Sequence, residues 1–370
     1  MIHIAGPKLG PFVARSLRIS AFLGTGGQFL KGIHITSANP IAVYAHIYAS
    51  SVSGATLLLP VNTMGKSYLS LNYTQESNSN PLLSYSAFDV IATEDATTVS
   101  ITPIAALTTG QPAGKAFTVT LNKGELYQGL SAADLTGTLI QSISTTSGSC
   151  KKIAVFSGSS KISIGCYTGP NTNNSGETAD NLFQQVYPTS TWGKNYITAP
   201  LDNRPYDIYR IVLSTPNTNV TLNGTLLTAS QFTGGGGLYY QFNSTTTNVI
   251  SANQPIQVVQ YTPTQGQGLN CTTVKNDVGD PEMIYLSPIE QGLDHVTLYS
   301  TGYYKILQSY INVVIPTSGV SSFTLDGYPY TSFTPVANNT AYSYAQIPVS
   351  SGPRYVYLPV WKPSYSHNCL

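Results

Sequence analysis

The sequence repeats a short motif that begins with proline. Pro60-Val-Asn-Thr-Met-Gly-Lys-Ser-Tyr68 returns as Pro188-Thr-Ser-Thr-Trp-Gly-Lys-Asn-Tyr196, at an offset of 188 − 60 = 128 residues. A degenerate third copy begins at Pro288-Ile-Glu-Gln-Gly292, a further 288 − 188 = 100 residues along. Repetition at these distances predicts tandem copies of one structural module, and single propeller blades are shorter, at about 40–50 residues.

The sequence after each copy has a strand, a polar turn and a second strand. The second copy is followed by Tyr209–Gly224 and the third by a stretch that ends at Asp326-Gly327. Asn-Gly and Asp-Gly fit tight hairpin turns because these residues tolerate positive φ. A closing pattern, Ile33–Tyr44, recurs as Ile250–Tyr261 and more loosely as Ile143–Phe156.

These motifs divide the chain into modules. We expect a partial first module with an atypical start at 1–59, full modules at 60–187 and 188–287, and a last module with an atypical tail at 288–370. Modules of about 100 residues with short strands are typical of β-sandwiches.

The local patterns predict strands throughout. Helical spacing of apolar residues is absent over three or four turns, whereas short runs rich in Val, Ile, Thr and Tyr alternate with Gly, Asn, Pro and Ser. The fold class predicted is all-β, with about three tandem antiparallel β-sandwich-like modules packed together. The expected strands include Ile41–Tyr48, Thr97–Thr102, Phe117–Leu121, Lys152–Phe156, Tyr209–Leu213, Ile256–Tyr261, Ile311–Ile315 and Phe323–Leu325.

The few charged residues argue against a nucleic-acid partner and indicate a secreted or cell-surface protein. Charged residues make up 9% of the chain, against about 25% in ordinary soluble domains, which is typical of secreted and cell-surface β proteins. The net charge is +1, and the basic residues form no cluster along the sequence, so no nucleic-acid partner is expected. No membrane-spanning run or convincing signal peptide occurs, so we expect the export signal to be missing from this chain by truncation.

Four cysteines are present, and two of them bracket a predicted hairpin. Strands at Ile153–Phe156 and Lys161–Ile164 with a turn at 157–160 would bring Cys150 and Cys166 within disulfide reach. A disulfide between Cys150 and Cys166 is therefore one pairing that the sequence allows. Cys271 has no partner evident in sequence, and no Cys/His cluster suggests zinc.

Residues for catalysis or for ligands are scattered. A Ser or Cys nucleophile needs a nearby base, but the histidines lie in strand patterns or near the ends of the chain. A glycosidase needs two carboxylates at a set separation. No such pair is evident among Asp89, Glu94, Asp95, Asp202, Asp207, Asp280 and Glu282. We predict no catalytic residues, no metal and no cofactor. Aromatic residues that could stack on a carbohydrate occur at Tyr239-Tyr240, Tyr303-Tyr304 and Trp192. Trp192 matches Met64 of the first copy, which favours core packing. Long loops at 73–86 and 168–180 are the other candidates for binding.

Eight motifs in one order resemble a known family. They are Lys31–Ile35, Leu57–Gly65, Val90–Asp95, Ala133–Gly137, Ile153–Gly158, Ser190–Lys194, Gly279–Met283 and Pro288-Ile-Glu-Gln291. Each motif is weak by itself, but the ordered set is similar to the IgGFc-binding protein N-terminal domain family over about 30–349, with its bacterial surface-protein branch the nearer. Both ends of the chain depart from the family pattern.

The resemblance implies an extracellular, non-enzymatic binding role and carries no defined set of ligand-contacting residues. We expect a binding or adhesion module of a larger secreted or cell-surface protein, with a protein, glycoprotein or glycan ligand. A structural spacer that presents another domain is the alternative hypothesis, and a carbohydrate-active enzyme is a third. An exposed aromatic patch would favour binding.

Overall fold

The computed structural model describes residues 2–5, 24–49, 52–78, 84–146, 148–165, 178–274, 279–300, 302, 306 and 308–359. The predicted fold class is confirmed, because these residues form antiparallel sheets linked by turns and short 3-10 helices. No helix in these ranges is both long and apolar enough to cross a membrane. We refer to 60–187, 188–287 and 288–359 as segments I, II and III, after the predicted module boundaries.

Two sheets make up segment I, and the second gains one edge strand, β2, from earlier in the chain. The first has the strand order β5 (Ser67–Leu69), β10 (Leu139–Ser142), β7 (Thr97–Thr102), β8 (Phe117–Leu121). The second has the order β12 (Asp180–Gln185), β11 (Ile153–Ile162), β6 (Ser86–Ala92), β9 (Glu125–Ser131), β2 (Gly27–Leu30). β6 alternates buried Phe88, Val90 and Ala92 with partly exposed neighbours, because successive side chains of a strand point to opposite faces.

Segment II is built around one long strand, β18 (Asn248–Thr262). Its first part pairs with β13 (Gly193–Thr198) and β15 (Val220–Leu222), and β15 pairs with β16 (Thr225–Leu226). Its second part pairs with β14 (Asp207–Leu213) and β19 (Glu282–Tyr285), and β14 pairs with β17 (Tyr239–Ser244). The strand therefore contributes to two sets of pairings.

Segment III has two smaller sheets. One has the order β20 (His295–Ser300), β26 (Gly352–Tyr357), β22 (Thr324–Leu325), β23 (Tyr328–Pro329), and the other β21 (Ser309–Pro316), β25 (Tyr342–Val349), β24 (Thr334–Pro335). Before segment I, β1 (Ile2–Ala5), β3 (Ala42–Ala49) and β4 (Val52–Leu57) form a separate sheet.

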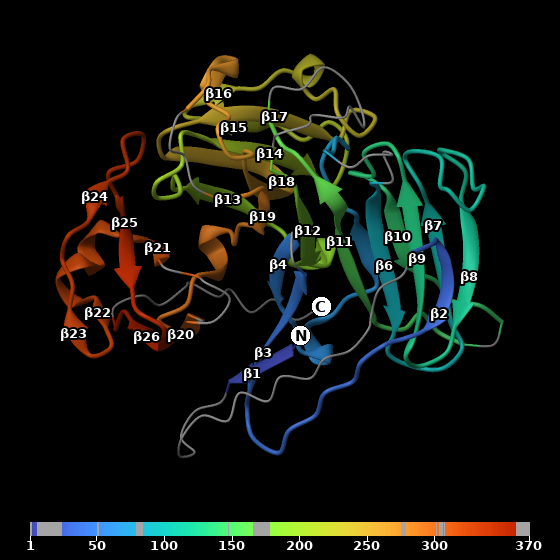
Figure 1. The fold of residues 1–370 in the computed structure, drawn as a ribbon. Helices are drawn as coiled ribbons and strands as arrows, with labels where there is room; N and C mark the ends of the chain where they lie inside the picture. Colours follow the sequence, from blue (N-terminus) through green and yellow to red (C-terminus); the bar gives the residue numbers. More distant parts are fainter. Residues whose placement is uncertain are drawn as a thin grey trace.

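The segments are arranged around the centre of the molecule. In Figure 1, segment I lies on the right, segment II at the top and segment III on the left, with β4, β12 and β19 near the middle. Side chains join β4 to β12: the Thr56 hydroxyl donates to Gln184 Oε1 at 3.1 Å, and the Leu59 N–H donates to Gln185 Oε1 at 2.8 Å. The last strands before the three proline motifs therefore lie close to one another.

The repeated proline begins a 3-10 turn in all three copies. These turns are η1 (Val61–Thr63), η2 (Thr189–Thr191) and η5 (Ile289–Gln291), each preceded by the motif proline. Proline suits this place because its fixed φ and missing N–H cost nothing at the start of a helical turn. The remaining turns are η3 (Ala229–Gln231), η4 (Leu269–Cys271) and η6 (Thr317–Ser322).

The repeated glycine allows one segment to touch the next. A Cβ atom at Gly65 would lie 2.4 Å from Pro188 Cβ, and a Cβ at Gly193 would lie 2.2 Å from Pro288 Cβ. Any side chain at these two positions would therefore overlap the proline of the following motif. The motif uses glycine here because only glycine permits this approach of backbone to proline ring.

The repeated tyrosine fixes the same junction from within each segment. The Tyr68 hydroxyl accepts the N–H of Gly65 at 2.8 Å and donates to Ile153 O at 2.8 Å. The Tyr196 hydroxyl likewise accepts the N–H of the glycine three residues earlier, at 3.3 Å, and donates to Ile256 O at 2.6 Å. Both tyrosines are fully buried, so each hydroxyl needs these partners to avoid a desolvation penalty.

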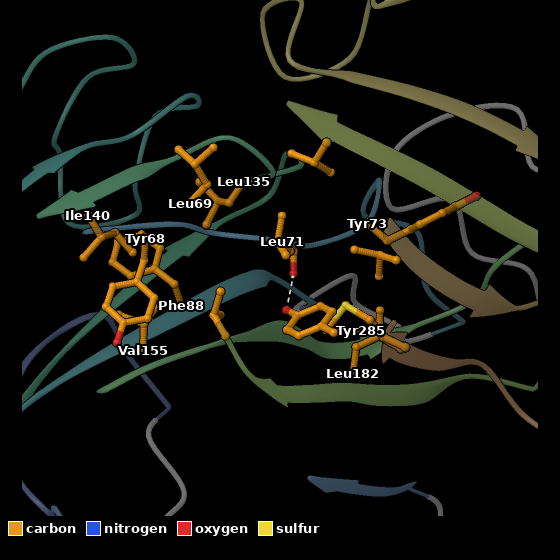
Figure 2. Close-up of a cluster of buried hydrophobic side chains, with 14 of the residues drawn as sticks. Tyr68, Leu69, Leu71, Tyr73, Phe88, Leu135, Ile140, Val155, Leu182 and Tyr285 are labelled. Atoms are coloured by element: carbon orange, nitrogen blue, oxygen red, sulfur yellow. Dashed lines mark hydrogen bonds between the residues drawn. The ribbon is translucent and has the colours of Figure 1, made fainter. Parts of the chain in front are cut away.

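Segments I and II share one hydrophobic core, whereas segment III has its own. The shared cluster includes Phe88, Val155 and Leu182 of segment I and Met283 and Tyr285 of segment II. Figure 2 shows part of it, with the dashed line marking the 3.1 Å hydrogen bond from the Tyr285 hydroxyl to Leu71 O. A second cluster lies within segment II, and a third, centred on Phe323, within segment III.

Arg210 is the polar centre of the contact between segments I and II. Its side chain is 1% exposed and its Nη1 lies 2.7 Å from Asp134 Oδ2. The guanidinium carbon lies 4.3 Å from the Tyr73 ring centre and 4.1 Å from that of Tyr239. Nη1 also donates to Asn72 O at 2.9 Å. These contacts supply the hydrogen bonds and opposite charge that a buried guanidinium requires.

The mutual pKa effects of this pair have the sign expected for a buried ion pair. Burial by itself would lower the pKa of Arg210, but Asp134 and the surrounding tyrosines raise it. Burial by itself would raise the pKa of Asp134, but Arg210 and hydrogen bonds from Thr136 hold it below its ordinary value. The pair is therefore charged in the folded protein.

The structure corrects two expectations. Cys150 is a free cysteine, and the predicted hairpin does not form, because β11 runs without a turn through Ser157–Ser160. An extended strand carries the chain about 3.3 Å further per residue, away from Cys150; Cys166 lies outside the described residues. The predicted surface loop at 73–86 is wrong over its first part, since Gln75 and Ser77 are fully buried.

Candidate functional site

The outer face of the β20–β26 pair carries exposed aromatic side chains. Tyr355 and Tyr357 are 48% and 38% exposed, while Val356 between them packs against the core of segment III. This alternation follows from the two-residue period of a strand. Across the pair, Tyr355 lies opposite Thr297 and Tyr357 opposite His295. We refer to His295, Thr297, Tyr355 and Tyr357 as the tyrosine face.

The imidazole of His295 packs on the ring of Tyr357. The ring centres are 4.3 Å apart with an interplanar angle of 39°. His295 Nδ1 also lies 3.0 Å from Asp294 Oδ1, and the side chains of both residues are mostly exposed. This interaction with His295 holds the pKa of Asp294 below its ordinary value. The aromatic surface is thus continuous from β26 to the start of β20 and has a carboxylate at its border.

The Asp-Gly turn between β22 and β23 holds β26 from its other side. Asp326 accepts the Tyr355 N–H at 2.9 Å and pairs with Arg354 at 2.9 Å. Asp326 and Gly327 have φ values of 54° and 82°, which confirms the tight turn predicted for Asp-Gly. Tyr355 therefore projects from a strand whose backbone is fixed on both sides.

Such a face is suited to binding and offers little for covalent chemistry. Tyrosine combines a large apolar ring, low side-chain entropy and a polar tip, and it is enriched where proteins recognise other proteins. Among the described residues, no group of three or more His, Cys, Asp or Glu is placed to hold a metal ion. The tyrosine face can bury apolar area and form hydrogen bonds with a partner surface.

The aromatic candidates weighed from the sequence lie elsewhere. Trp192 is buried and its indole N–H donates to Tyr187 O at 3.1 Å, which confirms the prediction of core packing. Tyr239 contacts Arg210 at the contact between segments I and II, and Tyr240 packs against the core of segment II. Tyr303-Tyr304 and most of the loop at 168–180 lie outside the described residues.

Two of the carboxylates weighed for catalysis, Asp89 and Asp207, lie on separate strands. Burial raises the pKa of Asp89 on β6 to about 7, and it accepts a hydrogen bond from Gln128 at 3.0 Å. Burial raises the pKa of Asp207 on β14 to about 6, and it accepts the Leu201 N–H at 2.9 Å. These bonds account for both groups as parts of the fold.

Glu282, at the start of β19, gives a prediction for stability. Burial and, to a smaller extent, the nearby Asp180 raise its pKa to about 8. Because the folded state binds this proton more tightly than the unfolded chain, its contribution falls as pH rises from about 4.5 towards 8. We expect Glu282→Gln to raise the free energy of unfolding at pH 8 by about 1–2 kcal/mol, discounted for partial exposure.

Urea unfolding at pH 5 and at pH 8 checks this prediction. The gain should be much smaller at pH 5, where Glu282 is protonated. Glu94→Gln, an exposed substitution of the same chemistry, serves as the control and should change little at either pH. Equal effects of Glu282→Gln at both pH values would contradict the prediction.

Comparison with known proteins identifies the family. The profile of a family described as IgGFc binding protein matches residues 54–359. The chain belongs to the IgGFc-binding protein family. This confirms the resemblance found in the sequence, and the match includes the whole tyrosine face.

One relative shows the scale of such proteins. The human protein called IgGFc-binding protein is 26% identical to this chain over 306 residues, which is 81% of the chain and 5% of the human protein. The chain thus spans about one twentieth of the length of this IgGFc-binding relative. No solved structure gives a significant match.

Proposed function

We propose that this chain is an extracellular binding module, part of a larger secreted or cell-surface protein, that recognises a folded protein or glycoprotein. The observation that carries the proposal is the tyrosine face, with Tyr355 and Tyr357 exposed side by side with His295 on a fixed strand pair. Family membership supports binding rather than catalysis. An extracellular place is supported by Cys271, which is disulfide-bonded, because disulfides persist in oxidising compartments.

The printed name of the human relative suggests the first protein to test. That protein is named for binding the Fc region of IgG, so an IgG Fc fragment is the first probe. A mucin-type glycoprotein and a neutral polysaccharide test the glycoprotein and glycan forms of the proposal. Each probe is titrated over the immobilised chain by biolayer interferometry.

Removing the two exposed rings should weaken binding without unfolding the chain. We expect Tyr355→Ser/Tyr357→Ser to weaken binding at least tenfold, because aromatic residues at the centre of an interface often contribute about 2 kcal/mol or more. Leu226→Ser is the matched control: Leu226 is 58% exposed on β16 of segment II, away from the face, and should leave affinity unchanged.

The outcomes separate the hypotheses. Saturable binding to any probe that the double variant loses supports the tyrosine face. Binding that the double variant retains places the site elsewhere and contradicts the proposal. A folded chain that binds none of the three probes favours the spacer hypothesis, in which the rigid contact between segments I and II serves only to present other domains.

A further inference from the structure

All three segments begin with a sheet of the same order. The order is β5-β10-β7-β8 in segment I, β13-β18-β15-β16 in segment II and β20-β26-β22-β23 in segment III. In each case the first strand follows the proline-led 3-10 turn. The third and fourth strands form a hairpin, closed by Asn223-Gly224 in segment II and Asp326-Gly327 in segment III.

The second sheet is repeated in full only in segments I and II. Its order is β12-β11-β6-β9 in segment I and β19-β18-β14-β17 in segment II. In segment III, β21 corresponds to β6 and β25 corresponds to β9. The registers agree: the first residue of β6, Ser86, pairs with the last residue of β9, Ser131. In the same way the first residue of β21, Ser309, pairs with the last residue of β25, Val349. Within the described residues, no strand of segment III takes the place of β11 or β12.

The edge of β21 is therefore open where β6 and β14 are paired. In the described part of the chain, β21 pairs with β25 alone. An open edge presents backbone N–H and C=O groups that another strand can pair with, and natural proteins generally cover such edges. The strand that fits this edge should resemble β11 and the second part of β18, which fill it in the other segments.

The hairpin of β3 and β4 has the sequence and position of the missing strands. Ile41-Ala-Val-Tyr44 at β3 matches Ile153-Ala-Val-Phe156 at β11. β4 ends three residues before its motif proline (60 − 57), as do β12 (188 − 185) and β19 (288 − 285). This hairpin thus corresponds to β11–β12 and to β18–β19, but among the described residues before Pro60 only the four-residue β1 lies at the place of β6.

β3 already lies next to segment III. Tyr44 lines a pocket of about 340 Å³ together with Ser309, Tyr310 and Ile311 of β21. Tyr44 is also hydrogen-bonded to the backbone of Tyr299 on β20. β3 pairs with β4 along one edge, as β11 pairs with β12. Its other edge corresponds to the edge of β11 that pairs with β6. In this structure that edge pairs with β1, and Val43 lies opposite Ile4.

We propose that β3 is the strand that completes the second sheet of segment III: it pairs antiparallel with β21 of the same chain, in place of β1, and closes the three segments into a ring. Pairing would satisfy the open edge of β21 and would replace the four-residue β1 on β3 by a longer partner strand. It would also fix the tyrosine face relative to segments I and II. The inference does not depend on the proposed function.

The other segments specify the register. Asp89 lies three residues after the first residue of β6 and pairs with Phe156 of β11. Arg210 lies three residues after the first residue of β14 and pairs with Val259 of β18. The same count from Ser309 gives Asn312, and Tyr44 corresponds to Phe156. Tyr44 should therefore lie opposite Asn312 in the closed ring.

Disulfide trapping tests this register. In the full chain with Cys150→Ser, Tyr44→Cys/Asn312→Cys should form an intramolecular disulfide on mild oxidation, because directly opposed strand residues are within about 5.5 Å. Peptide mapping identifies the bond, and non-reducing gels show whether the product is monomeric. Adding Ile4→Pro, which removes a backbone donor from β1, should speed the reaction several-fold.

The comparison pair is Tyr44→Cys/Tyr310→Cys. Tyr310 shares the pocket with Tyr44 in the present structure, but in the closed ring it is two residues out of register, about 7–8 Å away. Preferential trapping of this pair would mean that β3 stays beside β1 and would overturn the proposal. A cross-link found only in dimers, or no cross-link for Tyr44→Cys/Asn312→Cys, would overturn it as well.

Discussion

Replacing Arg210 by methionine should lower the free energy of unfolding by about 3–5 kcal/mol, the usual cost of removing one partner from a buried ion pair. The substitution leaves Asp134 partly buried without its cation and leaves the carbonyl of Asn72 without the donor at 2.9 Å. Because segments I and II share one core, the loss should weaken both together. Urea unfolding followed by tyrosine fluorescence measures the change.

Arg354→Met is the matched control for this prediction. Arg354 also pairs with an aspartate at 2.9 Å, but both side chains are partly exposed to solvent. Ion pairs in such positions contribute about 0–1 kcal/mol, so the control should be close to the unmodified protein. If the two variants lose similar stability, Arg210 has no special role in joining segments I and II.

Introducing a methyl group at Gly193 should destabilise the junction between segments II and III. The Cβ of Gly193→Ala would lie 2.2 Å from Pro288 Cβ, and the η5 turn would have to move. That movement would stretch the hydrogen bonds from Lys194 and Asn195 to Glu290, which are 3.2 and 3.1 Å long from the backbone N–H groups. Overpacking of this kind costs about 1–3 kcal/mol.

Gly148→Ala provides the comparison, because nothing lies within 4 Å of a Cβ at Gly148. We expect it to change the unfolding midpoint in urea very little. Gly65→Ala, which meets Pro188 at 2.4 Å, should behave like Gly193→Ala. A neutral result at both junction glycines would mean that the segments adjust freely and that the repeated glycine has another cause.

The sequence predicted the strands and the junction motif because both depend on local chemistry. Apart from Lys161–Ile164, of which only the first half lies in β11, every strand range named from the sequence lies largely within an observed strand. The motif proline, glycine and tyrosine have physical roles in a turn, a close approach and a buried hydrogen bond, and these roles demand particular residue types. The division into modules stays a prediction, and the shared core of segments I and II shows that these two segments are not independent of one another.

The failed disulfide shows what local patterns cannot provide. Ser157-Gly158-Ser159-Ser160 has the composition of a turn, yet it continues β11 between β6 and β12. Gly158 is needed there because a Cβ would lie 1.7 Å from Leu182 O. Tertiary packing therefore overrode turn propensity, and the contact involved is with a strand more than 20 residues away.

The tyrosine face was missed because its signal is short. Tyr355-Val-Tyr357 has the alternation expected of a strand with one buried and one exposed face. Tyrosine is common throughout this chain, however, and many of the other tyrosines are buried. Only the pairing of β26 with β20 brings His295 onto the ring of Tyr357. The same applies to Arg210, whose partners come from three separate stretches of sequence.

Hydroxyl-radical footprinting of the chain with and without saturating IgG Fc tests the central claim most directly. Oxidation of Tyr355 and Tyr357 should fall several-fold on binding, while that of the exposed Leu226 in segment II stays unchanged. Protection of Leu226 with both tyrosines still oxidised, or no change at any position, would contradict the assignment of the tyrosine face as the binding surface.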